Sequence, residues 1–573
     1  MEDVFAKHIV TRVAQILSVP EDALRVAVDA PPDPAMGQYA LGLFAAAKTL
    51  RRNPAELAAE VASKFNEDEL VRRPRAAGPY VNFSVQPPAY FRKALGAIQD
   101  EGDSFGRSSL GAQKTVIIEF SSPNIGKPLL VHHLRPTMIG NALCNFYRAL
   151  GYNVVAINHL GDWGTTFGQL MAAIERYNAA DVLKGAEVSA LNDLYVRFHD
   201  DAKNDPALLD KGREWFRRLE QGAGLAVARP SQAQQMWRRM CELSLAEYQR
   251  AYDLLGVKFD SYMGESAYTD MMPDSLRRLR EKGLTKISEG ATIVDLEPYG
   301  MPPCLLLKSD GTTIYATRDI AAAEYRAGAY RFSLMLYVVG AEQRLHFRQL
   351  FKVLELMGYD WAKNCVHLDF GLMRMKGVKM STRRGTVILL EELVHEAIRR
   401  VRALIEQKNP ALPDKEMIAT QVGIGALIFW DLKSKRVKDI DFNWEEALSF
   451  EGETGPYLQY THARLCSILR KYGKPVQREV KFERLSEPED LQVCRKLWNY
   501  PALVRQAAES YEPSILSGYL LDLSASINSY YHKHKVIVED ADLAAARILL
   551  VDCARQAIAN GLALLGIAAP KEM

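Results

Sequence analysis

The sequence has few cysteines, little net charge and no long apolar run. Its seven cysteines are scattered over 573 residues without a CxxC pair, which favours reduced thiols and a cytoplasmic protein over a disulfide-stabilised secreted one. No apolar stretch reaches the roughly 18 residues that a membrane-crossing helix needs, so we expect no membrane partner. The net charge of +2 neither requires nor excludes a nucleic-acid partner.

Signals for metal binding and for export are also missing. No cysteine or histidine group has the spacing of a zinc site, and the adjacent His132 and His133 cannot chelate one ion as an i, i+4 pair would. The first residues, MEDVFAKHIVTRVAQILSV, combine acids with helical periodicity, unlike a signal or transit peptide. We therefore predict no bound metal and no cleaved leader.

The chain is too long for one compact core, and its patterns divide it into three parts. Residues 1–110 mix helical patterns with a strand-like GPYVNFSV and predict a small N-terminal α/β domain. Residues 111–395 alternate β-rich and helical runs, which predicts a doubly wound parallel sheet of the Rossmann type. A charge-rich helical section at about 170–265 is expected to be an insertion in it. Residues 396–573 have almost no strand signal and predict an all-α helical bundle.

The predicted sheet is based on four β-rich runs. They are TVIIEF, NVVAIN, CLLLKS and LMLYVVG, which begin at residues 115, 153, 304 and 334. Ligands of such sheets bind beyond the carboxyl ends of the strands. Residues that follow these runs are therefore the first candidates for a functional site.

The loop after the first run could bind an anion. Glu119 ends the strand, Asn124 and Lys127 lie in the loop, and His132 and His133 stand where the next helix begins. A helix N-terminus offers unpaired N–H groups to a phosphate. This pattern indicates either an anion and a polar ligand held together, or a capped strand-to-helix turn with a surface lysine.

Three further segments carry polar residues at strand or helix ends. Gly161 and Asp162 follow the second run, where Asp162 is either a ligand-binding carboxylate or an exposed turn residue. Tyr315 and Asp319 are four residues apart on one predicted helical face, which suits a cationic substrate or simply a helix N-terminus that favours an acid. Gln343 follows the last run and could bind a ligand or cap the next helix.

The segment KGVKMSTRRG at 376–385 packs four cations into a short loop. Lys379, Arg383 and Arg384 could hold a polyphosphate while Ser381 donates a hydrogen bond. A basic surface loop is the alternative interpretation. The order Lys-Met-Ser is more specific than the charge alone.

These sites, in this order, resemble those of class I aminoacyl-tRNA synthetases, and most closely those of arginyl-tRNA synthetases. The resemblance covers the whole chain. The stretches that carry it are GPYVNF, NHLGDWGTTFG, GVKFDSYMGESAYTD, YATRDIAAAEYR, GAEQRLHFRQLF, KMSTRRG, FNWEEALSFEGETGPYLQYTHARLCSILRK and LLGIAAPKEM.

The resemblance implies an arginine–tRNA ligase. Such an enzyme forms arginyl-adenylate from L-arginine and ATP with Mg²⁺, and passes the arginyl group to the 3′ end of arginine tRNA. No prosthetic group is expected, and we expect a cytoplasmic monomer.

Carried over by position, three groups of residues would serve this reaction. The ATP phosphates would meet His133, Lys127, Lys379, Ser381 and Arg383, and the adenine would lie near His132 and Gly161. Arginine would be held by Glu119, Asn124, Asp162, Tyr315, Asp319 and Gln343. The tRNA elbow would contact Tyr80 and Asn82, and the anticodon would contact Tyr457 and Tyr460.

The family signature His-(Ala/Val)-Gly-His is altered here to Leu130-Val131-His132-His133. Leu130 replaces a polar donor, and His132 replaces a glycine that lets the flat adenine approach the backbone. One interpretation is an active ligase in which His132 is displaced from the base. The others are a paralogue that binds arginine or tRNA with little ligation, and an enzyme that adenylates arginine for another acceptor.

Overall fold

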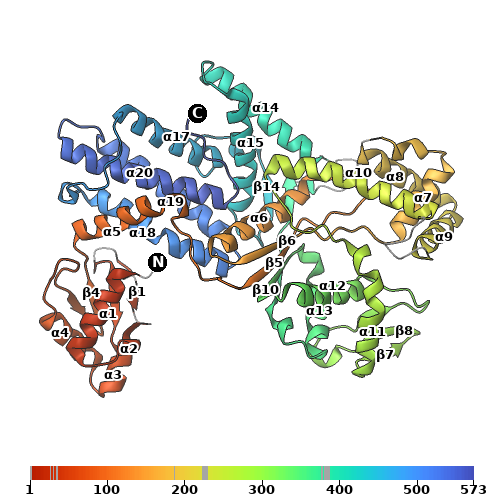
Figure 1. Cartoon of the computed structure of the whole chain (residues 1–573), viewed down its shortest axis with the longest axis horizontal. Coiled ribbons are helices and arrows are strands. Elements are labelled where there is room, and N and C mark those ends of the chain that lie inside the picture. The colour runs from red at the N-terminus through yellow and green to blue at the C-terminus, as the bar shows by residue number, and fades with distance from the viewer. Residues whose placement is uncertain are drawn as a thin grey trace. The chain divides into compact units, whose positions relative to one another are not determined.

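The computed structural model describes residues 3–573 except 26–27, 30, 34–35, 186, 222–229, 376–377 and 380–387. The chain forms two compact units, and Figure 1 labels their helices and strands. One unit contains Met1–Gly106, Thr461–Leu503 and Leu520–Asn560. The other contains Arg107–Tyr460, Val504–Tyr519 and Gly561–Met573.

The first unit contains an antiparallel sheet in the order β1-β2-β4-β3. Its strands are β1 (Val28–Asp29), β2 (Tyr39–Gly42), β3 (Arg75–Ala77) and β4 (Tyr80–Phe83). Its helices are α1 (Val4–Leu17), α2 (Asp22–Arg25), α3 (Phe44–Leu50), α4 (Pro54–Lys64) and α5 (Pro87–Glu101). The predicted strand in GPYVNFSV is thus confirmed as β4.

The side chain of Asp3 starts this unit by capping α1. It accepts hydrogen bonds from the backbone N–H groups of Phe5 and Ala6, both at 3.0 Å, which satisfies donors that a helix N-terminus leaves unpaired. The hydroxyl of Tyr39 on β2 donates to the same carboxylate at 2.8 Å. One acid therefore joins α1 to the sheet.

The second unit contains the predicted parallel sheet, in the order β11-β10-β5-β6. Its strands are β5 (Thr115–Glu119), β6 (Asn153–Ile157), β10 (Leu334–Val338) and β11 (Cys365–Leu368). Every neighbouring pair is parallel. The chain leaves β5 toward β6 on one side and reaches β10 on the other, so a topological switch point lies at the carboxyl end of β5, where such folds bind ligands.

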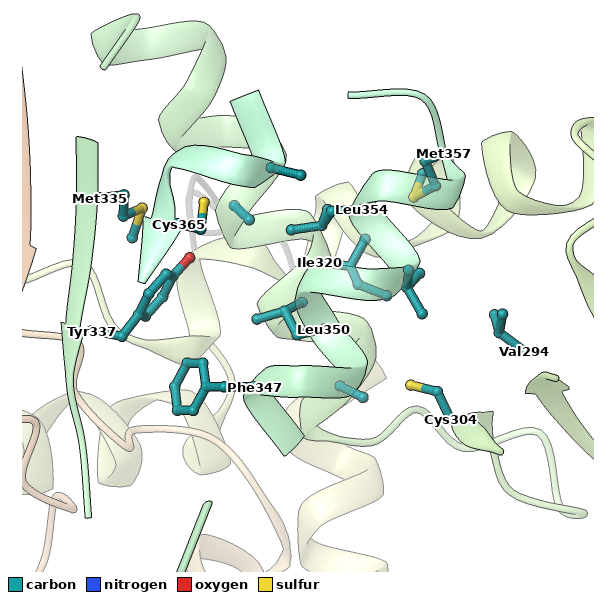
Figure 2. Close-up of a cluster of buried hydrophobic side chains, with 14 of the residues drawn as sticks. Val294, Cys304, Ile320, Met335, Tyr337, Phe347, Leu350, Leu354, Met357 and Cys365 are labelled. Atoms are coloured by element: carbon teal, nitrogen blue, oxygen red, sulfur yellow. The ribbon is translucent and has the colours of Figure 1, made fainter. Parts of the chain in front are cut away.

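A buried apolar core holds this sheet against α12 (Tyr315–Tyr330) and α13 (Arg344–Leu356). Figure 2 shows Phe347, Leu350 and Leu354 of α13 lying between Tyr337 of β10 and Cys304 of a second sheet. The apolar positions of α13 recur at intervals of three and four residues, the spacing of one helical face. The core thereby fixes where both helices begin, at the edge that carries the candidate site.

One of the four predicted parallel strands belongs elsewhere. CLLLKS contains β9 (Cys304–Leu307), which pairs antiparallel with β8 (Ala291–Val294), and β8 pairs antiparallel with β7 (Thr285–Ser288). The connections between these strands contain no α-helix. A parallel pair needs a longer crossover, so the assignment of CLLLKS to the parallel sheet was wrong. The strand β11, which the sequence analysis did not identify, takes the fourth place.

The remaining helices of the second unit fall into two groups. The described residues between Thr165 and Leu255 are mostly helical, and Figure 1 shows α7, α8 and α9 gathered near one end of α10. These helices are α7 (Thr165–Arg176), α8 (Val188–Asn204), α9 (Ala207–Gln221) and α10 (Gln232–Leu255). The others are α6 (Leu134–Ala149), α11 (Met272–Glu281), α14 (Leu390–Lys408), α15 (Lys415–Leu432) and α16 (Trp444–Ala447).

The C-terminal part is helical with one exception. Its helices α17 (Gly455–Tyr472), α18 (Pro488–Glu509), α19 (Ser514–Lys533) and α20 (Ala541–Leu564) each have residues in both units. The exception is β14 (Ile440–Phe442), which pairs parallel with β12 (Met373–Met375), itself paired with β13 (Val378–Lys379). Ile440 and Phe442 are buried and Asp441 is exposed, an alternation too short to stand out in the sequence.

A buried arginine fixes the loop that leads into β14. Arg135 on α6 is 1% exposed, and its Nη2 donates to the backbone carbonyls of Arg436 and Lys438 at 2.9 and 2.8 Å. Its Nη1 lies 3.6 Å from the carboxylate of Asp431 on α15. Burial raises the pKa of Asp431 to about 7, although the charge of Arg135 opposes this shift.

The sequence predicts reduced thiols and no membrane-crossing segment. All seven cysteines are free thiols, and six of them are buried. In the described part of the chain, no helix combines the length and the apolar character that crossing a membrane requires.

The packing of α6 against β5 gives a test of the fold. A Cβ at Gly140 would lie 2.1 Å from Cγ of the buried Phe120, so Gly140→Ala should overpack the core. We expect the free energy of unfolding to fall by about 1–3 kcal/mol, measured by urea unfolding. Gly328→Ala on α12 is the matched control, because nothing lies within 4 Å of its new Cβ. The control should be neutral or stabilising by up to about 1 kcal/mol; equal losses in both variants would contradict this account.

Candidate functional site

The loops that follow β5 and β6 are joined through their backbones. The N–H of Ile125 donates to the carbonyl of Gly161 at 3.1 Å, and the N–H of Gly161 donates to the carbonyl of Pro123 at 3.0 Å. A Cβ at Gly161 would lie 2.0 Å from Oδ1 of Asn124. Glycine is therefore needed here because the exposed Asn124 side chain lies against it.

Glu119, at the end of β5, is paired with a cation of the chain itself. Its carboxylate accepts a hydrogen bond from Nη1 of Arg326 on α12, and the two residues are 4% and 1% exposed. Burial is the largest single influence and opposes the charge of Arg326, but Glu119 together with Tyr268 and Tyr337 raises the arginine pKa. Nη2 of Arg326 also lies 3.3 Å from Nδ1 of His159, so the pair links β5, α12 and the loop after β6.

Asp319 lies between two histidines. Nε2 of His346, at the start of α13, is 2.6 Å from Oδ2 of Asp319, and Nε2 of His159 is 3.8 Å from Oδ1. The ring of Tyr315 meets that of His346 edge-on with centroids 4.8 Å apart. Burial opposes ionisation of Asp319, but the hydrogen bond of His346, together with His159 and Arg326, lowers its pKa below the ordinary value. The structure thus brings Tyr315 and Asp319 together on α12, as their spacing predicted.

The carboxylate of Asp162 is hydrogen-bonded to another residue of the chain. Its carboxylate oxygens accept from the N–H of Ser266 at 2.8 Å and from the Ser266 hydroxyl at 2.6 Å. The residue is 7% exposed, so the alternative of an exposed turn aspartate was wrong. Burial raises its pKa, although the bonds to Ser266 oppose this. Beside it, Glu265 pairs with Arg318 at 3.0 Å, and burial raises the pKa of Glu265 as well.

The altered signature forms a single turn of 3-10 helix, Val131–His133, directly before α6. Nδ1 of His133 lies 3.0 Å from the N–H of Leu130 and 3.2 Å from its carbonyl oxygen, and the shorter contact fits a neutral ring with the proton on Nε2. Burial, helped by the neighbouring His132, lowers the pKa of His133 well below its ordinary value and favours that neutral form. The two imidazole rings lie 4.2 Å apart, and the His132 side chain is exposed.

The signature segment is paired with the residues that follow the basic KMSTRRG segment. The N–H of Val131 donates to the carbonyl of Ile388 at 3.2 Å, and that of Leu390 donates to the carbonyl of Leu129 at 2.9 Å. Ser381 and Arg383 lie outside the described residues, as does the side chain of Lys379, whose backbone belongs to β13. Ile388 and Leu390, which follow this segment, thus lie beside the signature.

Lys127 and Gln343 complete the predicted set at this edge. Nζ of Lys127 lies 5.5 Å from the ring of Tyr195 on α8, and burial lowers the lysine pKa. The hydroxyl oxygen of Tyr248 on α10 lies 2.7 and 2.6 Å from the carbonyl oxygens of Asn124 and Lys127, and its single proton bonds to this loop. Gln343 is exposed at the start of α13 without a side-chain capping bond.

The predicted tRNA contacts differ in exposure. Tyr80 is 44% exposed and meets the ring of Phe44 edge-on at 5.5 Å, whereas Asn82, two residues along the same strand, is buried. On α17, Tyr457 is half-buried and Tyr460 is exposed. The ring of Tyr460 lies 6.3 Å from that of Phe450.

Within the described residues, one group has side-chain ligand atoms close enough to share a metal ion, namely Glu487, Glu489 and His534. Nζ of Lys533 already lies 2.7 Å from Glu489. The cluster is therefore accounted for as an ion-pair network.

Comparisons with known proteins place this geometry in a family. The family model described as "tRNA synthetases class I (R), catalytic domain" matches residues 98–444. The "DALR anticodon binding domain" matches residues 458–573, and the "Arginyl tRNA synthetase N terminal domain" matches residues 3–85. The chain belongs to the arginyl-tRNA synthetases.

Individual relatives of the arginyl-tRNA synthetase family agree over the whole length. A protein named arginine–tRNA ligase from Clostridium botulinum is 44% identical over 570 residues, 99% of this chain and 100% of its own. One from Halothermothrix orenii is 43% identical over 95% of both chains. The arginyl-tRNA synthetase structure from Thermus thermophilus matches with a TM-score of 0.81 at 28% identity, covering 99% of this chain and 100% of that one.

Four residues of the site were missed by the sequence analysis, although each lies in a stretch that resembles the arginyl-tRNA synthetases. They are His159, Glu265, Arg326 and His346. Arg326 follows Tyr315 and Asp319 at i+11 and i+7, the spacing of one helical face, so a helical projection would have found it. His159, Glu265 and His346 come from other elements, and only tertiary contacts show them.

The Glu119–Arg326 pair should be essential for folding. Arg326→Met would leave a buried carboxylate without a cation, which typically costs about 3–5 kcal/mol of unfolding free energy. Adding Glu119→Gln removes the charge, so the double variant should recover most of that loss in urea unfolding. Arg277→Met breaks only exposed pairs, with Glu281 and with Asp274, and should change stability by less than about 1 kcal/mol. If the double variant is no more stable than Arg326→Met, burial of the unpaired charge is not the cause.

Proposed function

We propose that the chain is an active arginine–tRNA ligase whose arginine pocket is centred on Asp319. Full-length relatives at 41–44% identity that carry the name arginine–tRNA ligase support the activity. They give no support to the alternative of a paralogue with little ligation. The reaction joins L-arginine to ATP, with Mg²⁺ as part of the nucleotide substrate, and passes the arginyl group to arginine tRNA.

The observation that carries the arginine pocket is the pairing of its acids. Glu119 and Glu265 already face arginines of the chain, and Asp162 is bonded to Ser266. Among the described residues, Asp319 has only histidines within hydrogen-bond or ion-pair distance, and its side chain is still 24% exposed. It is therefore the acid that can offer its charge to a substrate guanidinium, which forms bidentate bonds with carboxylates.

The other arginine contacts would come from three elements around Asp319. Tyr315 precedes it on α12, Gln343 begins α13, and Asn124 follows β5. Their side chains suit the α-amino and α-carboxylate groups of the substrate arginine and the flat face of its side chain. Glu119 and Asp162 would contribute by holding the walls of this pocket.

The ATP phosphates would bind at the strand-to-helix turn. His133 offers its Nε2–H, the backbone and dipole at the start of α6 favour an anion, and Lys127 adds a cation. Lys379, Ser381 and Arg383 would reach the same phosphates from the KMSTRRG loop. His132, exposed against His133, would stack on the adenine near Gly161.

The tRNA would use the aromatic rings at both ends of the chain. Tyr80, beside Phe44, and the exposed Tyr460, with Tyr457, offer faces on which unpaired bases stack. Asn82 would support Tyr80 from within the sheet. We propose that the protein acts as a monomer.

Asp319→Asn tests the arginine pocket. The unmodified chain should catalyse arginine-dependent ATP–pyrophosphate exchange and charge arginine tRNA. Loss of a carboxylate that pairs with a guanidinium should raise the KM for arginine about 100-fold or more, with the KM for ATP much less affected. No exchange or charging by the unmodified chain would sink the ligase assignment, and an unchanged arginine KM in Asp319→Asn would sink the pocket.

The two histidines of the altered signature should separate in their kinetics. His133→Ala removes a phosphate donor that acts as charge moves to pyrophosphate, so kcat should fall about 100- to 1000-fold. His132→Gly removes a stacking ring, so it should raise the KM for ATP several-fold while kcat is largely retained. Steady-state charging at varied ATP measures both. A larger kcat loss in His132→Gly than in His133→Ala would reverse these roles.

A further inference from the structure

His346 contacts Asp319 and Tyr315, two of the residues that the proposed function assigns to arginine binding. It lies in the first turn of α13 and is 8% exposed. Its Nε2 is 2.6 Å from Oδ2 of Asp319, and its ring receives the edge of Tyr315 with centroids 4.8 Å apart. Gln343 stands three residues earlier in the chain. A single buried imidazole is thus close to three of the proposed arginine contacts.

The chemistry of an imidazole suits this position better than that of another donor. Lysine or arginine would neutralise Asp319, as Arg326 neutralises Glu119. An imidazole can donate one N–H without carrying charge. Asp319 would then be held by a short bond while its negative charge remains for a ligand.

The bond also fixes the orientation of the carboxylate. A carboxylate has two oxygens and about four lone-pair directions, and His346 uses one of them on Oδ2. Oδ1 has only a long contact, 3.8 Å to His159. A planar guanidinium needs the carboxylate plane to be aligned with its own, and an alignment fixed beforehand lowers the entropy cost of binding.

We propose that His346 is a positioning residue of the arginine pocket, which holds the Asp319 carboxylate and the Tyr315 ring in place for the substrate guanidinium without cancelling the charge of Asp319. This inference rests on the proposed function. It concerns a residue that touches the binding groups and not the reacting atoms.

The pH dependence of arginine binding should report this role. The groups that face Asp319 from the surrounding elements are His346, His159, Arg326, Glu265, Cys304 and Tyr337. Within this set the His346 hydrogen bond is the largest influence that lowers the pKa of Asp319. Because that pKa is lowered, arginine binding should persist below the ordinary aspartate range and be lost as the pH falls through the folded-state pKa. Without the bond, the loss should begin at a higher pH.

The experiment uses the full chain with arginine tRNA and compares His346→Phe with His346→Gln. Phenylalanine keeps a ring for Tyr315 but removes the donor, whereas the glutamine amide keeps a donor close to the position of Nε2. We expect His346→Phe to raise the KM for arginine about 10- to 100-fold, in line with the loss of a hydrogen bond to a charged group. Its kcat should change much less, and the acid limb of kcat/KM for arginine should move to higher pH. His346→Gln should restore both values to within a few-fold.

Asp319→Asn is the reference variant, which distinguishes a failure of the His346 positioning role from a failure of the proposed arginine pocket. If Asp319→Asn raises the arginine KM but His346→Phe does not, the positioning role is overturned and the pocket stands. If neither raises it, the proposed pocket itself fails. Equal defects in His346→Phe and His346→Gln, with the acid limb unmoved, would show a packing role only.

Thermal unfolding of each variant guards against a folding defect. If His346→Phe does not fold, His346→Asn replaces it, because its shorter amide cannot reach Oδ2 in the same way. A raised arginine KM in His346→Asn together with recovery in His346→Gln supports the proposal. Equal arginine KM values in these two variants would overturn it.

Discussion

The ion pair between Glu119 and Arg326 determines the geometry of the whole functional edge. It ties the end of β5, where the phosphate-type loop starts, to α12, which carries Tyr315 and Asp319. Because both groups are buried, removing either one would leave the charge of the other unpaired in apolar surroundings. The loop after β6 joins the same arrangement through His159, and the backbone bridge from Asn124 to Gly161 ties it to the loop after β5. Two loops and one helix from different parts of the chain thereby meet at one switch point of the sheet.

Around this pair lie several acids, and they are balanced in different ways. Arginine side chains neutralise Glu119 and Glu265, and hydroxyl and backbone donors hold Asp162. Histidines hold Asp319. Negative charge is therefore concentrated at one partly exposed carboxylate and not spread over the pocket wall. Such a distribution favours a ligand that brings a single positive charge to one place.

The sequence predicted the parts of this protein that depend on local pattern. The strands β5, β6 and β10, the start of α12 at Tyr315 and the helical C-terminal part all follow from periodicity and end signals. CLLLKS was misassigned because a short apolar strand has the same pattern in an antiparallel sheet as in a parallel one. Among site residues, the spacing of Tyr315 and Asp319 was enough to place them together. Spacing also places Arg326 on the helical face of Tyr315 and Asp319, but its pairing with Glu119 was not predictable in this way. The pairing of His346 with Asp319 was not predictable either, because both pairs form only through the packing of α12 and α13.

Arg135 determines how the sequence of the loop at residues 433–439, which leads into β14, can vary. Its guanidinium binds the loop through the backbone carbonyl oxygens of residues 436 and 438 and not through their side chains. Main-chain recognition is indifferent to amino-acid identity, provided that the backbone keeps its course. The loop can therefore exchange its lysines for other residues during evolution without losing its anchor, while position 135 itself has no such freedom. The lysine charges of this loop can be adjusted independently of the scaffold beneath it, whereas the charge of Arg436 is held by Asp369.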